Sequence, residues 1–421
     1  MIVQYLKKQL VGFGGIIIYR LLLDINYMLI ISPNYDYAYF INEFSLGRCV
    51  ISYLLLFISI PFILKFYEDR HVFFSNVFVL LYLISFVPNL SFMVFKQAEG
   101  EFYLLYFIYW LILFIAAYKI KFFKIDCIKI RQQNVLLYLY LSILMFAVIY
   151  ISGRYTGFRI HFNITDVYTL RMEAREFEYP GIFGYLLPIA GTVLPILFVY
   201  FLNQKKNLLS FIIVIVILLN FSIAGLKGIL FSLLIAVFFY FFYTQKIIKL
   251  YVWMLSGVSL LAFTEYYLND TFLLSSLFIR RLLYVPAVLN QQYYEFFSTH
   301  DIDFFRQSFL RHFGFVSPYT DPISRVIGAN YYSELTAANN GLFSDAIMNM
   351  GTGGVLVFPV LLIVILKFTD SLSQGIENRF LIMPALMLTV AVFASPLMSA
   401  LLTNGILFVM LLFYIFPRTS H

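Results

Sequence analysis

Long apolar stretches separated by short polar segments recur along the whole chain of 421 residues. A helix that crosses the hydrocarbon core of a bilayer needs roughly 20 apolar residues, because the core is ~30 Å thick and each helical residue rises about 1.5 Å. The pattern therefore predicts about 12 spans. They are centred on residues 10–31, 46–64, 73–95, 101–120, 134–152, 182–202, 208–223, 228–244, 250–268, 343–366, 380–396 and 398–416. The alternation typical of strands is absent from these stretches, so we expect an all-α polytopic membrane protein.

Composition agrees with a membrane protein, since 62% of the residues are hydrophobic and only 12% are charged. A lipid bilayer is the expected partner of a single transmembrane domain that covers residues 1–421. The basic residues outside the spans recur in every second loop: Lys7, Lys8, Lys65, Arg70, Lys119, Lys121, Lys124, Lys129, Arg131, Lys205, Lys206, Lys246, Lys249, Lys367, Arg379 and Arg418. By the positive-inside rule we place these loops and both termini in the cytoplasm. The net charge of +7 is this topological signal, and it does not indicate a nucleic-acid partner.

Two connections, residues 153–181 and 269–342, fall on the predicted outer (periplasmic) side and are longer than a simple turn requires. Long loops are commonly functional or disordered, and the second one is rich in Tyr, Phe and Arg, which disfavours disorder. We expect the two outer loops to form the cap of an active site, the second as short helices that lie against the membrane.

The outer loops carry cations that the positive-inside rule disfavours. They are Arg154, Arg159, Arg171, Arg175, Lys227, Arg280, Arg281, Arg306, Arg311 and Arg325. Cations on the disfavoured side suggest a bound anion, and the planar guanidinium group of Arg is suited to two-point contact with a diphosphate. The other interpretation is that these side chains pair with nearby carboxylates or reach lipid phosphates.

Helical spacing pairs two of these cations in the first outer loop. Thr165 or Asp166 can cap a short helix that Pro180 terminates. Arg171 and Arg175, at positions i and i+4, then share a face of this helix. Such a helix would lie at the membrane interface and offer two guanidinium groups at headgroup level.

In the second outer loop, Arg280 and Arg281 are adjacent in the apolar stretch LFIRRLLYVPAV. Consecutive helical residues point about 100° apart, so we expect only one of the two to enter the site. Tyr284 lies one turn beyond Arg280 and could offer its hydroxyl to a sugar. His312 is a candidate general base, although a lone histidine is more often a surface residue.

The segment ANNGLFSDA places Asn339, Asn340 and Asp345 at the outer mouth of the predicted span 343–366. Amide and carboxylate groups there would either bind sugar hydroxyls or cap a helix. The sequence GTGG that follows, at 351–354, predicts close helix packing through small residues.

Two further features concern buried charge and metals. Arg20 and Asp24 have the spacing of an ion pair inside the first span, where such a pair is either functional or fixes helix packing. Sequence motifs for metal or nucleotide binding are absent, so we expect no metal site and no cofactor.

Three segments in the second half of the chain resemble the Wzy-type oligosaccharide repeat unit polymerases of bacterial O-antigen and capsule assembly. They are PGIFGYLLPIAG after the first outer loop, SIAGLKGILFSLL around Lys227, and RRLLYVPAVLNQQYYEFFS continuing to ANNGLFSDAIMNMGTGG. The order of these segments and the topology carry the resemblance, whereas the first half of the chain is similar only in hydropathy.

The resemblance implies a GT-C-like, metal-independent membrane glycosyltransferase on the outer face of the bacterial inner membrane. Such an enzyme moves a growing glycan from undecaprenyl diphosphate to an incoming lipid-linked repeat unit, and a chain-length regulator protein is an expected partner. Outer-loop cations contact the diphosphate in these enzymes. The catalytic candidates are then Arg171, Arg175, Arg280, Arg281 and His312, and the substrate-binding candidates are Lys227, Arg159, Tyr284, Asn339, Asn340 and Asp345.

Other activities fit part of the pattern. A flippase for the same lipid-linked sugars would carry its cations in a central cavity and have only short loops. An O-antigen ligase shares the topology and the large outer loop, and a catalytic His312 would favour it. A non-catalytic scaffold would not need the outer arginines.

Overall fold

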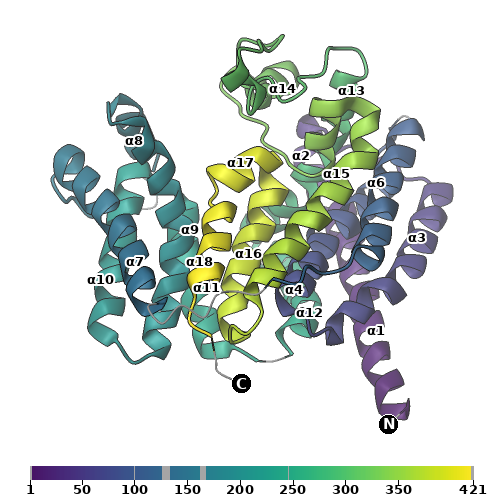
Figure 1. The fold of residues 1–421 in the computed structure, drawn as a ribbon. Helices are drawn as coiled ribbons and strands as arrows, with labels where there is room; N and C mark the ends of the chain where they lie inside the picture. Colours follow the sequence, from purple (N-terminus) through teal and green to yellow (C-terminus); the bar gives the residue numbers. More distant parts are fainter. Residues whose placement is uncertain (1, 99, 126–132, 162–166, 245, 419–421) are drawn as a thin grey trace.

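The computed structural model describes residues 2–98, 100–125, 133–161, 167–244 and 246–418, which form helices and loops (Figure 1). Ten helices in this part of the chain are long and apolar enough to cross a membrane. They are Val11–Ala38, Leu46–Glu68, Val72–Phe95, Gly100–Lys119, Asn134–Thr156, Gly181–Asn203, Asn207–Ala224, Ile247–Asn269, Phe343–Ser373 and Leu397–Ile415. Lys227–Phe242 and Arg379–Ala394, which overlap the predicted spans 228–244 and 380–396, are apolar but shorter. The all-helical fold is thus confirmed, and it is compatible with a multi-pass membrane protein.

One group of helices encloses a fully buried segment. It contains α1 (Ile2–Asn26), α2 (Ser32–Tyr35), α3 (Leu46–Leu64), α4 (Val72–Leu81), α5 (Val87–Phe95), α6 (Gly100–Lys119) and α12 (Ile247–Asn269). α1 packs along α12, and α3 packs against α5. The most apolar window of Val72–Phe95 is entirely buried, so α4 and α5 are covered on every side. This position explains why their sequence has no polar face.

A second group lies at the left of Figure 1. It contains α7 (Gln133–Ile151), α9 (Gly181–Asn203), α10 (Asn207–Ala224) and α11 (Lys227–Phe242). α9 packs against the other three, and Gly225 makes the turn from α10 to α11 with a left-handed φ of 59°, which glycine adopts without steric cost.

The last four helices lie between the two groups (Figure 1). They are α15 (Phe343–Ser373), α16 (Arg379–Ala394), α17 (Leu397–Leu402) and α18 (Ile406–Ile415). α15 packs along α6, and α16 packs along α4 and also contacts α9. α15 is broken at Gly351, whose φ of 56° and ψ of −145° are not helical. The GTGG sequence therefore does more than allow close packing, because its first glycine makes a kink.

The two loops predicted to be outer, 153–181 and 269–342, contain short helices, as expected. The first has α8 (Val167–Glu176), and the second has a π-helix (Ser275–Tyr284), α13 (Val285–Phe297), a 3₁₀ turn (Leu310–Phe313) and α14 (Ile323–Tyr331). The predicted caps Thr165 and Asp166 lie outside the described residues. In Figure 1, α8, α13 and α14 lie at one end of the bundle, and α1 begins and α18 finishes toward the other end.

Candidate functional site

A cavity of about 310 Å³ lies between the second outer loop, the start of α15 and the start of α17. Its walls are mostly polar or small side chains: Tyr293, Asp303, Phe305, Gln307, Ser308, Pro322, Ile323, Ser324, Asn339, Asp345, Met348, Asn349, Pro396, Met398 and Ser399. Two of these residues, Asn339 and Asp345, were predicted to bind substrate. None of the lining residues is basic, so the cavity is acidic in character.

Asp345 lies in the first turn of α15 and its side chain is only 2% exposed. Its Oδ1 accepts a hydrogen bond of 2.8 Å from Nδ2 of Asn349, one turn further along the helix. Its Oδ2 accepts a bond of 2.6 Å from the backbone N–H of Leu397, at the start of α17. Asp345 therefore caps α17, which is one of the two roles considered from the sequence, and it also lines the cavity.

Asp303 supplies a second buried carboxylate, from the middle of the outer loop. Its two oxygens accept hydrogen bonds from Oγ of Ser317 at 2.6 Å and from the backbone N–H of Gln307 at 2.9 Å. The loop is fastened to α15 beside it, because the N–H of Phe305 donates to Oδ1 of Asn349 at 2.8 Å. The loop thus closes over the start of α15 and forms the outer wall of the cavity.

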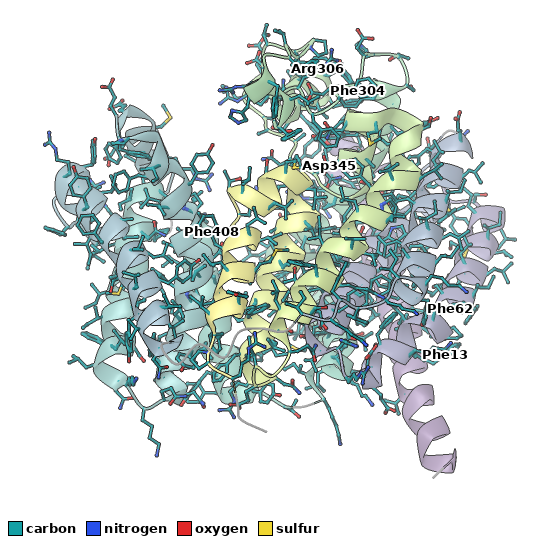
Figure 2. The ribbon with its side chains drawn as sticks, viewed as in Figure 1. Phe13, Phe62, Phe304, Arg306, Asp345 and Phe408 are labelled. Carbon is teal, nitrogen blue, oxygen red and sulfur yellow. The ribbon has the colours of Figure 1, made fainter. Side chains whose placement is uncertain are left out.

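Arg306 lies above this cavity, and its guanidinium group bonds to backbone carbonyls of the same loop. Its Nε donates to the carbonyl of Asp303 at 2.7 Å, and one terminal nitrogen donates to the carbonyl of Ile302 at 2.6 Å. Figure 2 shows Arg306 and Phe304 in the outer cap, with Asp345 beneath them. The guanidinium group therefore stabilises the loop.

Arg171 and Lys227 both lie near the turn between α10 and α11. Nε of Arg171, on α8, donates to the carbonyl of Gly225 at 3.1 Å, and Lys227 opens α11 two residues later. Arg159 pairs with Glu173 of α8, and its hydrogen bond lowers the pKa of the Glu173 carboxyl below the ordinary value. The side chain of Arg175 lies outside the described part of the chain.

Arg280 and Arg281 differ in their surroundings, as expected for adjacent helical positions. The guanidinium carbon of Arg280 lies 4.3 Å from the centre of the Tyr35 ring, and this side chain is half-buried. Its Nε is buried without a hydrogen-bond partner among the described residues. Arg281 is exposed. Arg280 is therefore the member of the pair with an unused donor inside the protein.

Tyr284 does not lie at a substrate surface, contrary to the expectation from its spacing. It is fully buried, and its hydroxyl bonds to the carbonyl of Leu23 at 2.9 Å and to Oγ of Ser91 at 2.7 Å. The reason is that this turn packs against α1 and α5. Ser91 also donates to Asp24, which pairs with Arg20 as the sequence predicted.

Asn340 and His312 also lie outside the cavity wall. Asn340 is 2% exposed, and its Nδ2 lies within 3.1 Å of acceptors on Pro286, Asn290 and Ser344. It therefore holds the start of α15 against α13. His312 is exposed in the 3₁₀ turn Leu310–Phe313.

Several residues of the cavity were missed from the sequence. Asn349 could have been found, because it lies at i+4 from Asp345 on the same helix. Asp303 and Gln307 could not have been found, because the spacing of residues in an irregular loop does not show where the loop folds back. The described residues contain no group of three or more His, Cys, Asp or Glu side chains placed to hold a metal ion. Comparison of the chain with protein-family models, with curated proteins and with solved structures found no match in any of the three.

Proposed function

We propose that this protein polymerises undecaprenyl-diphosphate-linked oligosaccharide repeat units on the outer face of the bacterial inner membrane. The cavity of Asp303 and Asp345 supports this best, because it puts carboxylates, amides and hydroxyls under the cap and beside apolar helices. A lipid-linked sugar needs both environments, since its glycan is polar and its carrier is apolar. The volume is at the small end for ligand sites, which suits the terminal sugar of a repeat unit.

In the proposed reaction, a hydroxyl of the incoming repeat unit attacks the anomeric carbon of the growing glycan. A new C–O bond forms, the bond from that carbon to the diphosphate oxygen breaks, and the hydroxyl proton passes to a base. We assign the base to Asp345, whose carboxylate lines the cavity. Undecaprenyl diphosphate leaves as an anion, and fixed cations can stabilise it without a metal.

We assign the leaving diphosphate to Arg280. Buried donors are normally paired, and the Nε of Arg280, in the second outer loop, has no acceptor among the described residues, which supports a role as donor to a bound anion. Arg171 and Arg159, in contrast, already donate to Gly225 and Glu173. Arg281 would meet lipid headgroups, and Lys227 remains a second cation for the glycan or its carrier.

This function places the cap in the periplasm and both termini in the cytoplasm. A chain-length regulator is a further proposed partner. The assignment of sides rests on the basic loops, which join helices away from the cap.

Deletion of the gene tests the proposal through the glycans that the strain makes. Loss of a polymerase leaves surface glycans with a single repeat unit, which a gel resolves from a ladder. The wild-type gene should restore the ladder and Asp345→Asn should not, whereas Asp321→Asn, which changes an exposed carboxylate of the same loop, should restore it. An unchanged ladder in the deletion strain would refute the proposal.

One observation favours a transporter as the second candidate. The kink at Gly351 leaves the start of α15 as a short half-helix, and broken helices of this kind form substrate sites in transporters. The same deletion separates the candidates, because loss of a flippase traps repeat units inside the cell. Loss of a ligase, the activity that His312 would favour, removes surface glycan entirely.

A further inference from the structure

A basic pocket of about 520 Å³ lies away from the cap, where α3, α4, α6 and α15 approach one another. Its lining includes five lysine or arginine side chains and one carboxylate: Lys65, Arg70, Lys121, Lys124 and Lys367, with Asp69. Lys65, Arg70, Lys121 and Lys124 are exposed. The pocket therefore offers several cations to a soluble or membrane-bound anion.

The floor of this basic pocket is firmly built. Nζ of Lys367 donates to the carbonyl of Ala117 at 2.6 Å and lies 4.5 Å from the centre of the Phe122 ring. The imidazole of His71 stacks on the same ring, and its Nδ1 lies 2.6 Å from Oδ2 of the buried Asp370. These contacts join α6, α15, the residue before α4 and the α6–α7 connection, so packed side chains hold the floor of the pocket.

An apolar groove of about 330 Å³ adjoins the basic pocket. It runs between α3 and α6 and is lined by Leu55, Ile58, Ser59, Phe62, Phe86, Phe107, Trp110, Leu111, Phe114, Ile115, Tyr118 and Lys119. Tyr118 belongs to both, and Nζ of Lys65 lies 5.3 Å from the centre of its ring. Figure 2 places Phe62 at the outer edge of the bundle, where lipid would be.

We infer that the groove and the basic pocket together bind one anionic membrane lipid. The phosphate of its headgroup lies among Lys65, Arg70 and Lys121, and one of its acyl chains lies in the groove along Trp110. The basic side chains of the pocket attract the anionic headgroup, and the apolar walls of the groove favour an acyl chain over water. Lysines that served only to set the topology of the chain would not require a pocket that continues into an apolar groove. This inference is independent of the proposed polymerase activity.

Tryptophan fluorescence can test the inference, since the chain has two tryptophans and one of them lines the groove. In a Trp253→Phe background, Trp110 is the single emitter. The full-length protein is reconstituted in phosphatidylcholine vesicles, and lipids with brominated acyl chains are titrated in. Brominated phosphatidylglycerol should quench Trp110 at a lower mole fraction than brominated phosphatidylcholine does.

The charge contribution is isolated by a matched pair of double variants. Lys65→Gln with Lys121→Gln should reduce the preference for phosphatidylglycerol by roughly fivefold for each lysine, because a basic residue near an anionic surface contributes about that factor. Lys205→Gln with Lys206→Gln removes the same charge from the α9–α10 turn and should leave the preference intact.

Three outcomes would overturn the inference. Equal quenching by the two brominated lipids would show that the groove holds bulk lipid without selection. An equal loss in both double variants would show a general surface charge effect. If inorganic phosphate reversed the quenching at concentrations too low to screen charge, the basic pocket would be a site for soluble phosphate compounds.

Discussion

Asn349 donates a hydrogen bond of 2.8 Å from Nδ2 to Oδ1 of Asp345, one helical turn before it, and its own Oδ1 accepts from the backbone of Phe305. This amide joins the carboxylate of α15 to the outer loop. The other carboxylate oxygen binds the start of α17. A single aspartate thus connects three segments around the cavity, and its structural and chemical roles must be separated by experiment.

Asp345→Asn and Asp345→Ala should separate those roles. The asparagine keeps an oxygen for the N–H of Leu397 but cannot take a proton, so we expect transfer to fall by about 10²–10⁴. Its NH2 group then faces the donor Nδ2 of Asn349, so we also expect a loss of about 1–3 kcal/mol in stability. The alanine leaves the N–H of Leu397 and the amide of Asn349 unpaired, which costs about 1–3 kcal/mol for each buried group. Extension of a lipid-linked repeat unit is measured per folded protein. Full activity in Asp345→Asn would leave Asp345 with only a structural role.

Arg280→Ala should lower the rate of transfer by about 10²–10³, the usual cost of one charge-stabilising donor. Arg280→Lys should rescue only part of this loss, because lysine keeps the charge but not the planar fork. Arg281→Ala is the matched control and should be tolerated, since Arg281 is exposed. Polymer ladders, normalised to protein abundance, are the measurement. Normal ladders from Arg280→Ala would rule out the assignment of the diphosphate to Arg280.

Glycan transfer by the purified protein should continue in EDTA. The physical reason is that arginine and lysine already supply the positive charge that a diphosphate leaving group requires. Transfer is measured with a lipid-linked repeat unit in detergent, with and without the chelator. Complete loss in EDTA that magnesium or manganese restores would contradict this expectation.

The sides of the membrane can be assigned by labelling single cysteines. After Cys49 and Cys127 are changed to serine, an impermeant thiol reagent should label His300→Cys in intact cells and should label Ile125→Cys only after lysis. The reason is that His300 lies in the cap loop, whereas Ile125 lies in a basic loop between α6 and α7. The reverse pattern would invert the topology.

Breaking the Arg20–Asp24 pair should destabilise the protein without a specific effect on transfer. Arg20 is fully buried and also donates to the carbonyl of Leu90 at 2.9 Å, while Asp24 accepts from the hydroxyl of Tyr53 at 2.8 Å. Removal of one partner of a buried pair typically costs about 3–5 kcal/mol. Asp24→Asn should therefore lower the melting temperature in detergent. A stable variant that has lost transfer would instead indicate a functional charge.

The sequence pattern predicted the apolar helices because burial in a membrane or a bundle requires uniform stretches, as in Val72–Phe95. It also predicted the Arg20–Asp24 pair, since both residues lie on one helix. It could not predict that Tyr284 turns inward, because that depends on the packing of its π-helix against α1 and α5. Only part of the cavity could be predicted, because packing again decides the rest. Asp345 lies at the start of a helix that the sequence predicts, whereas Asp303 reaches the cavity only through the fold of a loop.

The kink at Gly351 has a consequence for how the cavity responds to the bilayer. Its φ and ψ fall near a region that only glycine occupies readily, and a Cβ there would approach no atom closer than 3.8 Å, so the backbone and not packing excludes other residues. A continuous helix would pass any change in its tilt directly to Asp345. With the helix interrupted, its first turns contact the outer loop, α13 and α17 through side chains that precede the kink. A spanning segment can then tilt to match local membrane thickness while the geometry of the carboxylate stays fixed.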